Sequence, residues 1–408
     1  MPTTWLVTFS GTDAPGITAE MTGVLARHRV VILDVAQAVI QRLLSLSFLF
    51  RSEEEVSGES SVIQELASRA SALALKIEIK TIDSGLNLPR HLRPSHHYAV
   101  TLIAECVSAQ ALSEVTHALA RWQLNIDVIK KLSEEQFGCV ELLVSRDEPI
   151  DEKRLRKELL ELAKDQEVDI ALQAEGLYRR SKRLVALDMD STLIQGEVID
   201  ELAREHGVYE AVASMTQSAM QGHMDYNESL RLRCEKLKGM TADQLLKVYD
   251  KIQVTPGAQD LIQVLKKLGY KVALLSGGFS FVADRLKERL GIDFAYANTL
   301  EMQNGVLTGR VLAPIVNAQR KADLLEVIAQ QEKIDLDQVI AMGDGANDLL
   351  MLEKAGLGIA FNAKPLVRER ADLAFSQKNM RSILYLLGLS ARDVAQVIGT
   401  EERSGPSL

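Results

Sequence analysis

The sequence predicts an α/β protein in which two small α+β units precede a larger domain built on a parallel sheet. The small units are indicated by the order βαββαβ, which occurs twice at a spacing of about 90 residues. The larger domain is indicated after residue 181, where short apolar runs typical of buried strands alternate with helical patterns. A chain of 408 residues has room for roughly two to four domains of about 100–200 residues each.

The first unit is expected over residues 1–85. Strand patterns occur at residues 5–10, 30–40, 43–51 and 75–81, and helical patterns at 17–28 and 61–73. A turn cluster, Gly11–Gly16, separates the first strand from the first helix. This order of elements folds as an antiparallel sheet backed by helices.

A linker is expected at residues 86–96, where two prolines stand among polar residues. The order of elements then returns over residues 97–176, with little identity between the two copies. Strands are expected at 97–105, 125–132, 137–145 and 167–175, and helices at 109–122 and 151–165. The repeat indicates a duplicated unit or a binding pair.

The third domain is expected over residues 181–396. Its first strand, RLVAL at 183–187, has the composition of a strand buried on both faces. Similar runs, each followed by a helix, stand at 271–275, 339–342 and 357–360. A helical insertion of about 197–255 interrupts the alternation, Asn304-Gly305 indicates a hairpin, and 397–408 is expected to be a flexible tail. In such a sheet the functional site lies at the carboxyl ends of the strands.

Composition excludes several classes of function. The 47 basic and 56 acidic residues give a net charge of −9, which argues against nonspecific nucleic-acid binding. Three cysteines, Cys106, Cys139 and Cys234, are too few for a disulfide framework or a Cys-rich zinc site, and they favour a reducing cytoplasm. We expect no signal peptide in the first 16 residues and no membrane span, since no apolar stretch reaches about 18 residues.

Two pairs of carboxylates follow predicted buried strands. Asp188 and Asp190 come directly after RLVAL, and Asp344 and Asp348 lie in GDGAND after VIAM. Taken alone, the first pair also fits a turn or helix cap, and the second a Gly-Asp-Gly turn. Their joint occurrence at strand ends favours one acidic cavity, where mutual repulsion calls for a cation or a shared proton. Carboxylate oxygens suit Mg²⁺ rather than zinc.

Two further strand ends carry groups that suit an anion. Ser276-Gly277-Gly278 follows the strand KVALL and precedes a helix expected near Phe279. A hydroxyl and free backbone N–H groups there would form an anion seat, and a plain Gly-rich loop is the alternative. Lys321 begins another helix, where a lysine is usually solvated unless a fixed anion offsets the helix dipole. A metal, a hydroxyl and an ammonium supply the positive environment that a phosphoryl dianion requires.

Residues 181–390 resemble the haloacid dehalogenase superfamily of aspartate-nucleophile phosphatases. The four motifs of that superfamily stand in order: DMDST at 188–192, Ser276 behind its strand, Lys321, and GDGAND at 343–348. The resemblance implies a Rossmann-like sheet and makes Asp188 the nucleophile that becomes an aspartyl-phosphate. It makes Asp190 the general acid for the leaving alcohol and later the base for water, and an acid at that position favours hydrolysis.

The resemblance also implies which residues hold the metal and the phosphate. The implied Mg²⁺ residues are Asp188, Asp190 through its backbone carbonyl, Asp344 and Asp348, which also supports Lys321. The implied phosphate-binding residues are Ser276, the Gly277 backbone, Lys321 and Asn347.

The helical insertion corresponds to the cap that sets specificity in this superfamily. The segments QGEVID at 195–200, Met215-Thr216 and ESLRLR at 228–233 resemble the phosphoserine phosphatases. That resemblance implies that Glu197 meets the substrate ammonium, that Arg233 meets its carboxylate and that Met215 is apolar lining. A zwitterion needs one anion and one cation, and Arg binds a carboxylate in a bidentate fork. A pair of surface helix charges is the alternative interpretation of Glu197 and Arg233, and an ordinary core residue is the alternative for Met215.

The turn GTDAPGI at residues 11–17 resembles the ligand loop of ACT domains, which bind amino acids, usually where two units associate side by side. The resemblance makes Asp13 and Gly16 effector-binding candidates, with a simple turn residue as the alternative for Asp13. The second copy has AECVS at 104–108 instead, which favours a structural role. Two such units before a capped phosphatase resemble the long, mycobacterial-type phosphoserine phosphatases.

The leading hypothesis is a cytoplasmic, Mg²⁺-dependent phosphatase that releases L-serine and phosphate from O-phospho-L-serine, the last step of serine synthesis. We expect regulation by an amino acid, with serine as the first candidate, and a homodimer or higher assembly. Two alternatives stay open: a capped phosphatase for another small phosphomonoester or for phosphoproteins, and an inactive amino-acid-sensing protein. Retention of all six catalytic side chains disfavours the last. An ion-pumping ATPase shares the Asp nucleophile, but it needs membrane spans.

Overall fold

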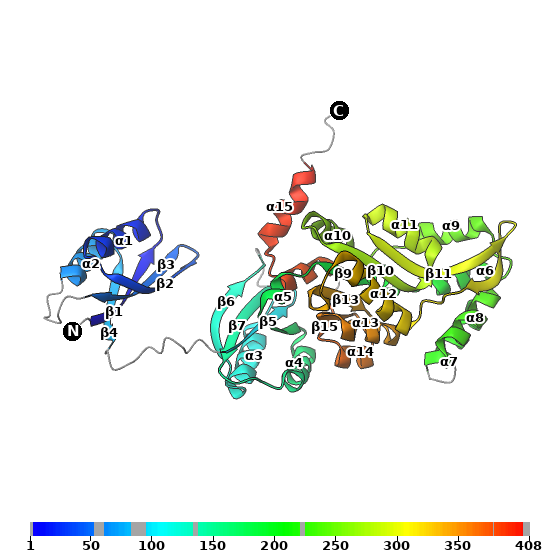
Figure 1. Ribbon diagram of the computed structural model, residues 1–408, viewed down its shortest axis with the longest axis horizontal. Helices are drawn as coiled ribbons and strands as arrows, with labels where there is room; N and C mark the ends of the chain where they lie inside the picture. Colours follow the sequence, from blue (N-terminus) through cyan, green and yellow to red (C-terminus); the bar gives the residue numbers. More distant parts are fainter. Residues whose placement is uncertain are drawn as a thin grey trace, which may run out of the picture. The chain divides into compact units, whose positions relative to one another are not determined.

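The computed structural model describes residues 3–52, 61–82, 95–133, 138–220, 225–377 and 379–402. The chain divides into two compact units, Met1–Arg93 and Pro94–Leu408. The first unit holds the first α+β domain, and the second unit holds the second α+β domain together with the larger domain (Figure 1). Most of the predicted linker, residues 86–96, lies outside the described residues.

The first α+β domain has the predicted order of elements. These are β1 (Thr3–Thr12), α1 (Ile17–Arg27), β2 (Val31–Ile40), β3 (Leu43–Ser52), α2 (Ser61–Ala72) and β4 (Lys76–Ile82). The antiparallel sheet has the order β2-β3-β1-β4. Alternation along the strands directs Val7, Phe9, Leu46 and Phe48 into the core with the two helices, while the other face of the sheet is more polar.

The second α+β domain repeats this arrangement. Its elements are β5 (His96–Ile103), α3 (Ala109–Arg121), β6 (Asn125–Lys131), β7 (Cys139–Arg146), α4 (Glu152–Gln166) and β8 (Asp169–Ala174). The sheet order β6-β7-β5-β8 matches that of the first domain. Val100, Leu142 and Leu172 pack against the helices on one face of the sheet.

The larger domain is a seven-stranded sheet with the order β12-β11-β10-β9-β13-β14-β15, parallel except for β12. Its strands are β9 (Leu184–Leu187), β10 (Lys271–Phe279), β11 (Phe294–Gln303), β12 (Val306–Leu312), β13 (Val339–Gly343), β14 (Leu357–Phe361) and β15 (Leu373–Phe375). Its helices are α5 (Leu177–Arg180), α6 (Val198–His206), α7 (Tyr209–Met220), α8 (Tyr226–Lys236), α9 (Ala242–Lys251), α10 (Ala258–Lys267), α11 (Ser280–Leu290), α12 (Ala318–Glu332), α13 (Leu349–Lys354), α14 (Pro365–Arg370) and α15 (Ala391–Glu402).

The central strand β9 is buried on both faces, as its composition predicts. Leu184 and Ala186 pack with α12 and α13 on one side, and Val185 and Leu187 pack with α10 and the cap on the other. The cap helices α6–α9 lie between β9 and β10 in sequence, and Gly239 and Met240 hydrogen-bond to Leu307 of β12 at the edge of the sheet. The β11–β12 hairpin turns at Asn304-Gly305, both with positive φ, as predicted.

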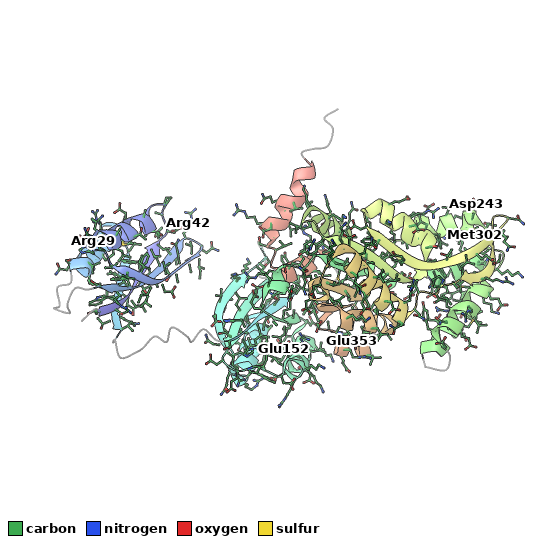
Figure 2. The ribbon with its side chains drawn as sticks, viewed as in Figure 1. Arg29, Arg42, Glu152, Asp243, Met302 and Glu353 are labelled. Carbon is green, nitrogen blue, oxygen red and sulfur yellow. The ribbon has the colours of Figure 1, made fainter. Side chains whose placement is uncertain are left out.

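The second α+β domain docks on the larger domain through the face of its sheet that carries no helices. On that face Thr101 and Glu141 are buried, and Glu141 forms an ion pair with the buried Arg179 of α5. Asp169 of β8 accepts hydrogen bonds from Ser376 N (2.8 Å) and Ser376 Oγ (2.6 Å), just after β15. Arg156 of α4 forms an ion pair with Asp372. It also forms an ion pair with Glu152, in which Nη2 lies 3.3 Å from Oε2 (Glu152 is labelled in Figure 2).

Three features differ from the sequence prediction. Strand β10 continues through Ser276–Gly278 to Phe279, with an irregular register, so these residues are not a loop after the strand. Strand β15 was not predicted because three residues are too short for a periodicity. Helix α15 extends through Glu402, whereas 397–408 was expected to be a tail; residues 403–408 lie outside the described part. In the part of the chain that the structure describes, none of the helices combines the length and the apolar character that a membrane span requires.

Candidate active site

Three carboxylates from two strand ends meet in the larger domain. Asp188 follows β9, Asp344 follows the neighbouring β13, and Asp348 closes the short helical turn that comes next. One carboxylate oxygen of each lies within 4.8 Å of the others. Asp188 and Asp348 are buried. The parallel sheet therefore brings together two motifs that are more than 150 residues apart in sequence.

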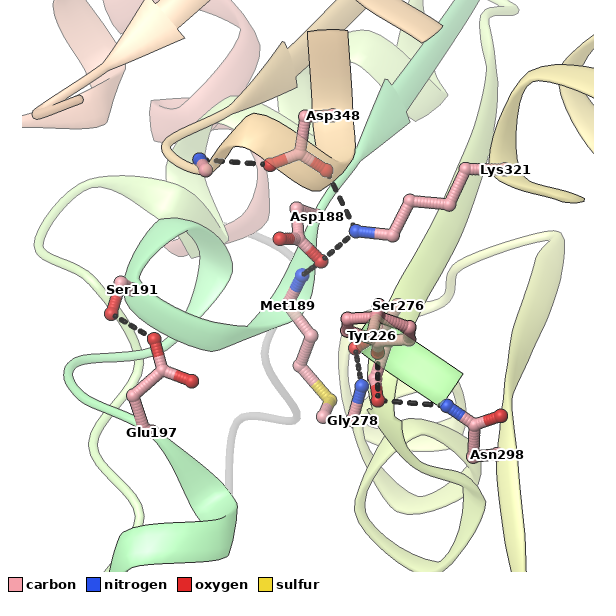
Figure 3. Close-up of polar contacts among 12 residues, drawn as sticks. Asp188, Met189, Ser191, Glu197, Tyr226, Ser276, Gly278, Asn298, Lys321 and Asp348 are labelled. Atoms are coloured by element: carbon pink, nitrogen blue, oxygen red, sulfur yellow. Dashed lines mark hydrogen bonds and ion pairs between the residues drawn. The ribbon is translucent and has the colours of Figure 1, made fainter. Parts of the chain in front are cut away.

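Lys321 reaches this cluster from α12. Its Nζ lies 2.8 Å from Asp188 Oδ1 and 2.7 Å from Asp348 Oδ1 (Figure 3), and its side chain is fully buried. Burial opposes the charged ammonium, but the two carboxylates outweigh burial and raise the pKa of Lys321. Lys321 is therefore not the solvated helix residue that its position alone would favour.

Asp188 is held by donors on one of its two oxygens. Oδ1 accepts from Met189 N at 2.7 Å and contacts Lys321, which leaves Oδ2 available to a metal or a phosphoryl group. Burial, followed by the charge of Asp348, raises the pKa of Asp188 well above its usual range, and Lys321 only partly offsets this. An ionised Asp188 therefore needs more positive charge than Lys321 alone provides.

Asp190 is held by the turn that follows Asp188. The chain reverses at Ser191, which has a positive φ of 56°, and Asp190 Oδ1 then accepts from Val198 N at 2.9 Å. Ser191 Oγ donates to Glu197 Oε1 at 3.2 Å (Figure 3). Burial, followed by the charge of Glu197, raises the pKa of Asp190 to about 7.

The donor set suits a hard divalent cation. All ligand atoms in the cluster are carboxylate oxygens, which Mg²⁺ prefers. Burial and the charges of Asp348 and Glu197 raise the pKa of Asp344 to about 7, so the cluster lacks positive charge. A cation bound between Asp188, Asp344 and Asp348 would supply that charge.

The glycines of Ser276–Gly278 allow β10 to end against the acidic cluster. A β-carbon at Gly278 would lie 2.3 Å from Asp190 Oδ2, so a larger residue there would displace the Asp190 carboxylate. Gly278 N donates to Ser276 Oγ at 2.8 Å. The sequence suggested free N–H groups here, but this N–H already has a partner within the strand.

A cavity of about 350 Å³ opens between the strand ends and the cap. The predicted residues that line it are Asp188, Asp190, Glu197, Arg233, Gly277, Asp344 and Asn347. Ser276, Lys321 and Asp348 are fully buried behind its wall. Met215 is not part of the lining, whereas its neighbour Thr216 is, so Met215 as substrate lining stays a prediction without support from the cavity.

The two residues expected to bind the amino-acid end of the substrate both line this cavity. Glu197 stands at the start of α6 beside Asp190, and Arg233 extends from α8. Arg233 Nε donates to Ser229 O at 3.3 Å, and Arg233 Nη1 donates to Thr216 Oγ1 at 3.4 Å. The cavity thus has an anion and a cation on its cap side, as a zwitterionic ligand requires.

Sequence reasoning missed several residues of the site. Tyr226, Asp200 and Lys364 line the cavity, and Asn298 supports its wall. Lys364 could have been found, because it stands in the loop after the buried strand β14, as Asp344 stands after β13. Tyr226 and Asn298 give no such signal, because their partners lie 51 and 21 residues away.

The proposed effector loop of the first α+β domain is exposed. Gly16 stands at the N-cap of α1 with a φ of 98°, a backbone conformation that favours glycine. Asp13 N donates to Arg42 O at 2.8 Å, which fits a turn residue. In the second domain Ser108 caps α3 instead and accepts from Ala111 N at 3.0 Å. Effector binding by Asp13 and Gly16 stays a prediction.

Two of the three cysteines are buried packing residues. Cys106 is exposed, while Cys139 and Cys234 are buried. Burial raises the pKa of both buried thiols to about 12, so they stay protonated and act as packing residues.

Comparison with known families matches all three domains. Residues 182–356 match the haloacid dehalogenase-like hydrolases, and residues 3–80 and 95–173 each match the ACT domain. Among solved structures, a HAD family hydrolase from Salmonella enterica serovar Typhi superposes with a TM-score of 0.64 at 32% identity, over 71% of this chain and 98% of the other. A probable phosphoserine phosphatase from Vibrio cholerae gives 0.57 at 34% identity, over 74% and 88%.

The fold and its acidic strand ends thus define a haloacid dehalogenase-like hydrolase with two ACT domains. A phosphoserine phosphatase from Streptomyces coelicolor is 41% identical over 99% of this chain and 97% of its own length. Phosphoserine phosphatase SerB2 from Mycobacterium tuberculosis is 38% identical over 95% of this chain and 94% of its own length. The chain belongs to the phosphoserine phosphatase family, in its long form with two ACT domains.

Proposed function

We propose that this enzyme hydrolyses O-phospho-L-serine to L-serine and phosphate with the help of Mg²⁺, as the last step of serine synthesis. The observation that carries the proposal is that Glu197 and Arg233 line the same cavity as Asp188 and Asp344. One cavity therefore offers a recognition pair for an amino acid and an acidic centre for phosphoryl transfer.

Asp188, Asp344 and Asp348 would hold the Mg²⁺, with the backbone carbonyl of Asp190 as a further ligand. When bound, the ion would offset the carboxylate charges and draw electron density from the phosphoryl oxygens. Lys321 would neutralise the remaining charge from the buried side, where its two ion pairs fix its position.

In the first half of the reaction, a carboxylate oxygen of Asp188 attacks phosphorus. The bond between phosphorus and the serine oxygen breaks, and Asp190 gives its proton to that oxygen. The raised pKa of Asp190, about 7, suits a group that must donate a proton near neutral pH. The products of this step are L-serine and an aspartyl-phosphate on Asp188.

In the second half, Asp190 takes a proton from water, whose oxygen attacks the phosphorus of the aspartyl-phosphate. The bond to Asp188 breaks, and phosphate leaves. The hydrogen bond from Val198 N keeps Asp190 in place for both steps. The cap carries Glu197 and Arg233, so substrate binding would draw it over the site and exclude water.

Two variants test this proposal. Asp188→Asn should abolish phosphate release from O-phospho-L-serine, because an amide is a far weaker nucleophile than a carboxylate. Arg233→Ala should lower kcat/KM for O-phospho-L-serine by about a hundredfold, because a hydrogen bond to a charged group contributes roughly 1.5–3 kcal/mol. The same variant should lower kcat/KM for an aryl phosphate much less, because that substrate has no carboxylate for Arg233 to bind. Equal losses on the two substrates would refute the carboxylate role, and an active Asp188→Asn enzyme would refute the nucleophile.

We also propose that the first ACT domain binds an amino-acid effector, with serine as the first candidate, at the loop that holds Asp13 and Gly16. A homodimer is the expected assembly. The edge strand β2 of the first ACT domain supports a homodimer. Its side chains Val31, Val35 and Ile40 are exposed, and one edge of the strand is unpaired within that domain. Isothermal titration with serine and light scattering test these two points. A cytoplasmic location follows from the proposed pathway.

A further inference from the structure

The carbonyl of Gly277, in the wall of the cavity, is held between the core and the cap. Asn298 Nδ2 of β11 donates to it at 2.8 Å, and the Tyr226 hydroxyl of cap helix α8 donates at 3.2 Å (Figure 3). Asn298 is itself fixed, because it is fully buried and its Oδ1 accepts from Val316 N at 2.8 Å. The core therefore fixes one side of this peptide, and the cap fixes the other.

The N–H group of the same peptide reaches the residue expected to bind phosphate. Gly278 N donates to Ser276 Oγ at 2.8 Å, so the serine hydroxyl acts as acceptor there and its own hydrogen is directed elsewhere. Gly278 also lies directly against Asp190, since a β-carbon there would be 2.3 Å from Asp190 Oδ2. A tilt of the Gly277–Gly278 peptide would therefore disturb both Ser276 and the side of Asp190.

The approach of Tyr226 depends on the glycine that it contacts. A β-carbon at Gly277 would lie 2.3 Å from the Tyr226 hydroxyl oxygen, so a larger residue there would displace the Tyr226 hydroxyl. Burial raises the pKa of Tyr226 to about 12, so the hydroxyl stays protonated and can donate throughout the neutral range. At 3.2 Å the bond is longer than a typical hydroxyl–carbonyl bond, which leaves room for the cap to move closer.

We propose that Tyr226 is a positioning residue for phosphoryl transfer. Through its hydroxyl, the cap sets the Gly277–Gly278 peptide, and through that peptide it aims the Ser276 hydroxyl at the phosphoryl group. Seating of the cap and binding of phosphate are then coupled by one hydrogen bond. The inference rests on the proposed function only in taking Ser276 as a ligand of the phosphoryl group.

A second bond between cap and core separates this role from simple docking of the cap. Asn317 Nδ2, at the start of α12, donates to Asn227 Oδ1 at 3.3 Å, next to Tyr226 in sequence. Asn227→Ala removes that bond without touching Gly277. Tyr249→Phe is the matched chemical control, because it also removes one hydroxyl from a cap helix while its ring stays beside Arg285.

The experiment measures kcat and KM of the full-length enzyme with O-phospho-L-serine and with an aryl phosphate, and the inhibition constant of inorganic phosphate. Tyr226→Phe should lower kcat/KM about three- to tenfold, by the same factor for both substrates, and raise the phosphate inhibition constant similarly. Tyr249→Phe should equal the parent, and Asn227→Ala should leave the phosphate inhibition constant unchanged. In a Ser276→Ala background, Tyr226→Phe should change phosphate inhibition by less than about twofold.

Four results would overturn the inference: a Tyr226→Phe enzyme equal to the parent, a loss confined to O-phospho-L-serine, an equal phosphate effect of Asn227→Ala, or full additivity with Ser276→Ala. A different result would refute the proposed substrate. A parent enzyme that cleaves the aryl phosphate but not O-phospho-L-serine would refute that substrate, while the aryl phosphate and inorganic phosphate would still decide the role of Tyr226.

Discussion

The two ACT domains share one fold but differ in what covers the open face of their sheets. In the first, Thr8 of β1 and Ser47 of β3 bond to each other at 2.9 Å and stay partly exposed within their unit. In the second, Thr101 and Glu141 at comparable places are 0% and 3% exposed, because the catalytic domain packs on them. The same fold therefore forms one compact unit by itself and, in its second copy, part of one compact unit with the catalytic domain.

The most severe test of this comparison removes the domains one at a time. A chain that begins at Pro94 should fold and keep kcat within about threefold of the parent, because it retains the whole second unit. A chain that begins at Lys182 should lose more than about 3 kcal/mol of unfolding free energy or aggregate, since it exposes the apolar surface that covers Ile103, Cys139 and Ala171. Urea unfolding and light scattering measure both. A stable, monodisperse chain from Lys182 would contradict the structural role.

The next largest effect is expected at the buried ion pair Arg179–Glu141, which joins α5 of the catalytic domain to β7 of the second ACT domain. Arg179→Ala should cost about 3–5 kcal/mol of unfolding free energy, because it leaves Glu141 charged and buried without its partner. Urea denaturation gives the value. Replacing the pair together, as Arg179→Met with Glu141→Leu, should recover most of the loss. If the single and the double variants were equally unstable, lost packing rather than an unpaired charge would be the cause.

A smaller, pH-dependent effect is expected at Lys182, at the junction of the second ACT domain and the catalytic domain. Burial lowers the pKa of Lys182 to about 8, and Asp337 and Asp372 only partly oppose this. The folded state thus binds fewer protons than the unfolded state between pH 8 and about 10.5, and stability should rise with pH in that window. Between pH 8 and 10, the unfolding free energy of the parent should rise by about 1–3 kcal/mol more than that of Lys182→Met, as measured in urea titrations. Parallel pH profiles would show that Lys182 is not the source.

The smallest effect is expected in the first domain, where the comparable ion pair is exposed. Arg27 pairs with Glu65 at 2.5 Å, and the Arg27 side chain is 53% exposed. Arg27→Ala should leave the urea midpoint of this domain within experimental error, because an exposed pair gains little over its hydration. A midpoint shift as large as that of Arg179→Ala would remove the contrast between the two domains.

Much of the fold and of the acidic cluster could be predicted from the sequence, and the reason is local. A buried parallel strand has a distinctive apolar run, and the next residue must lie at the carboxyl edge of the sheet, so Asp188 and Asp344 were placed without any knowledge of distant contacts. The contacts of Tyr226 and the burial of Glu141 were not predictable in this way. Both depend on elements far apart in the chain, and a tyrosine in the first turn of a helix or a glutamate in a strand has the same local pattern when solvated.

The edges of the catalytic sheet have a consequence for solubility. An outer strand with unpaired N–H and C=O groups is a template on which another polypeptide can extend the sheet, and this begins aggregation. Here Gly239 and Met240 of the cap bond to Leu307 of β12 on one side, and β8 of the second ACT domain lies against β15 on the other. The cap and the second ACT domain thus shield the catalytic sheet from self-association.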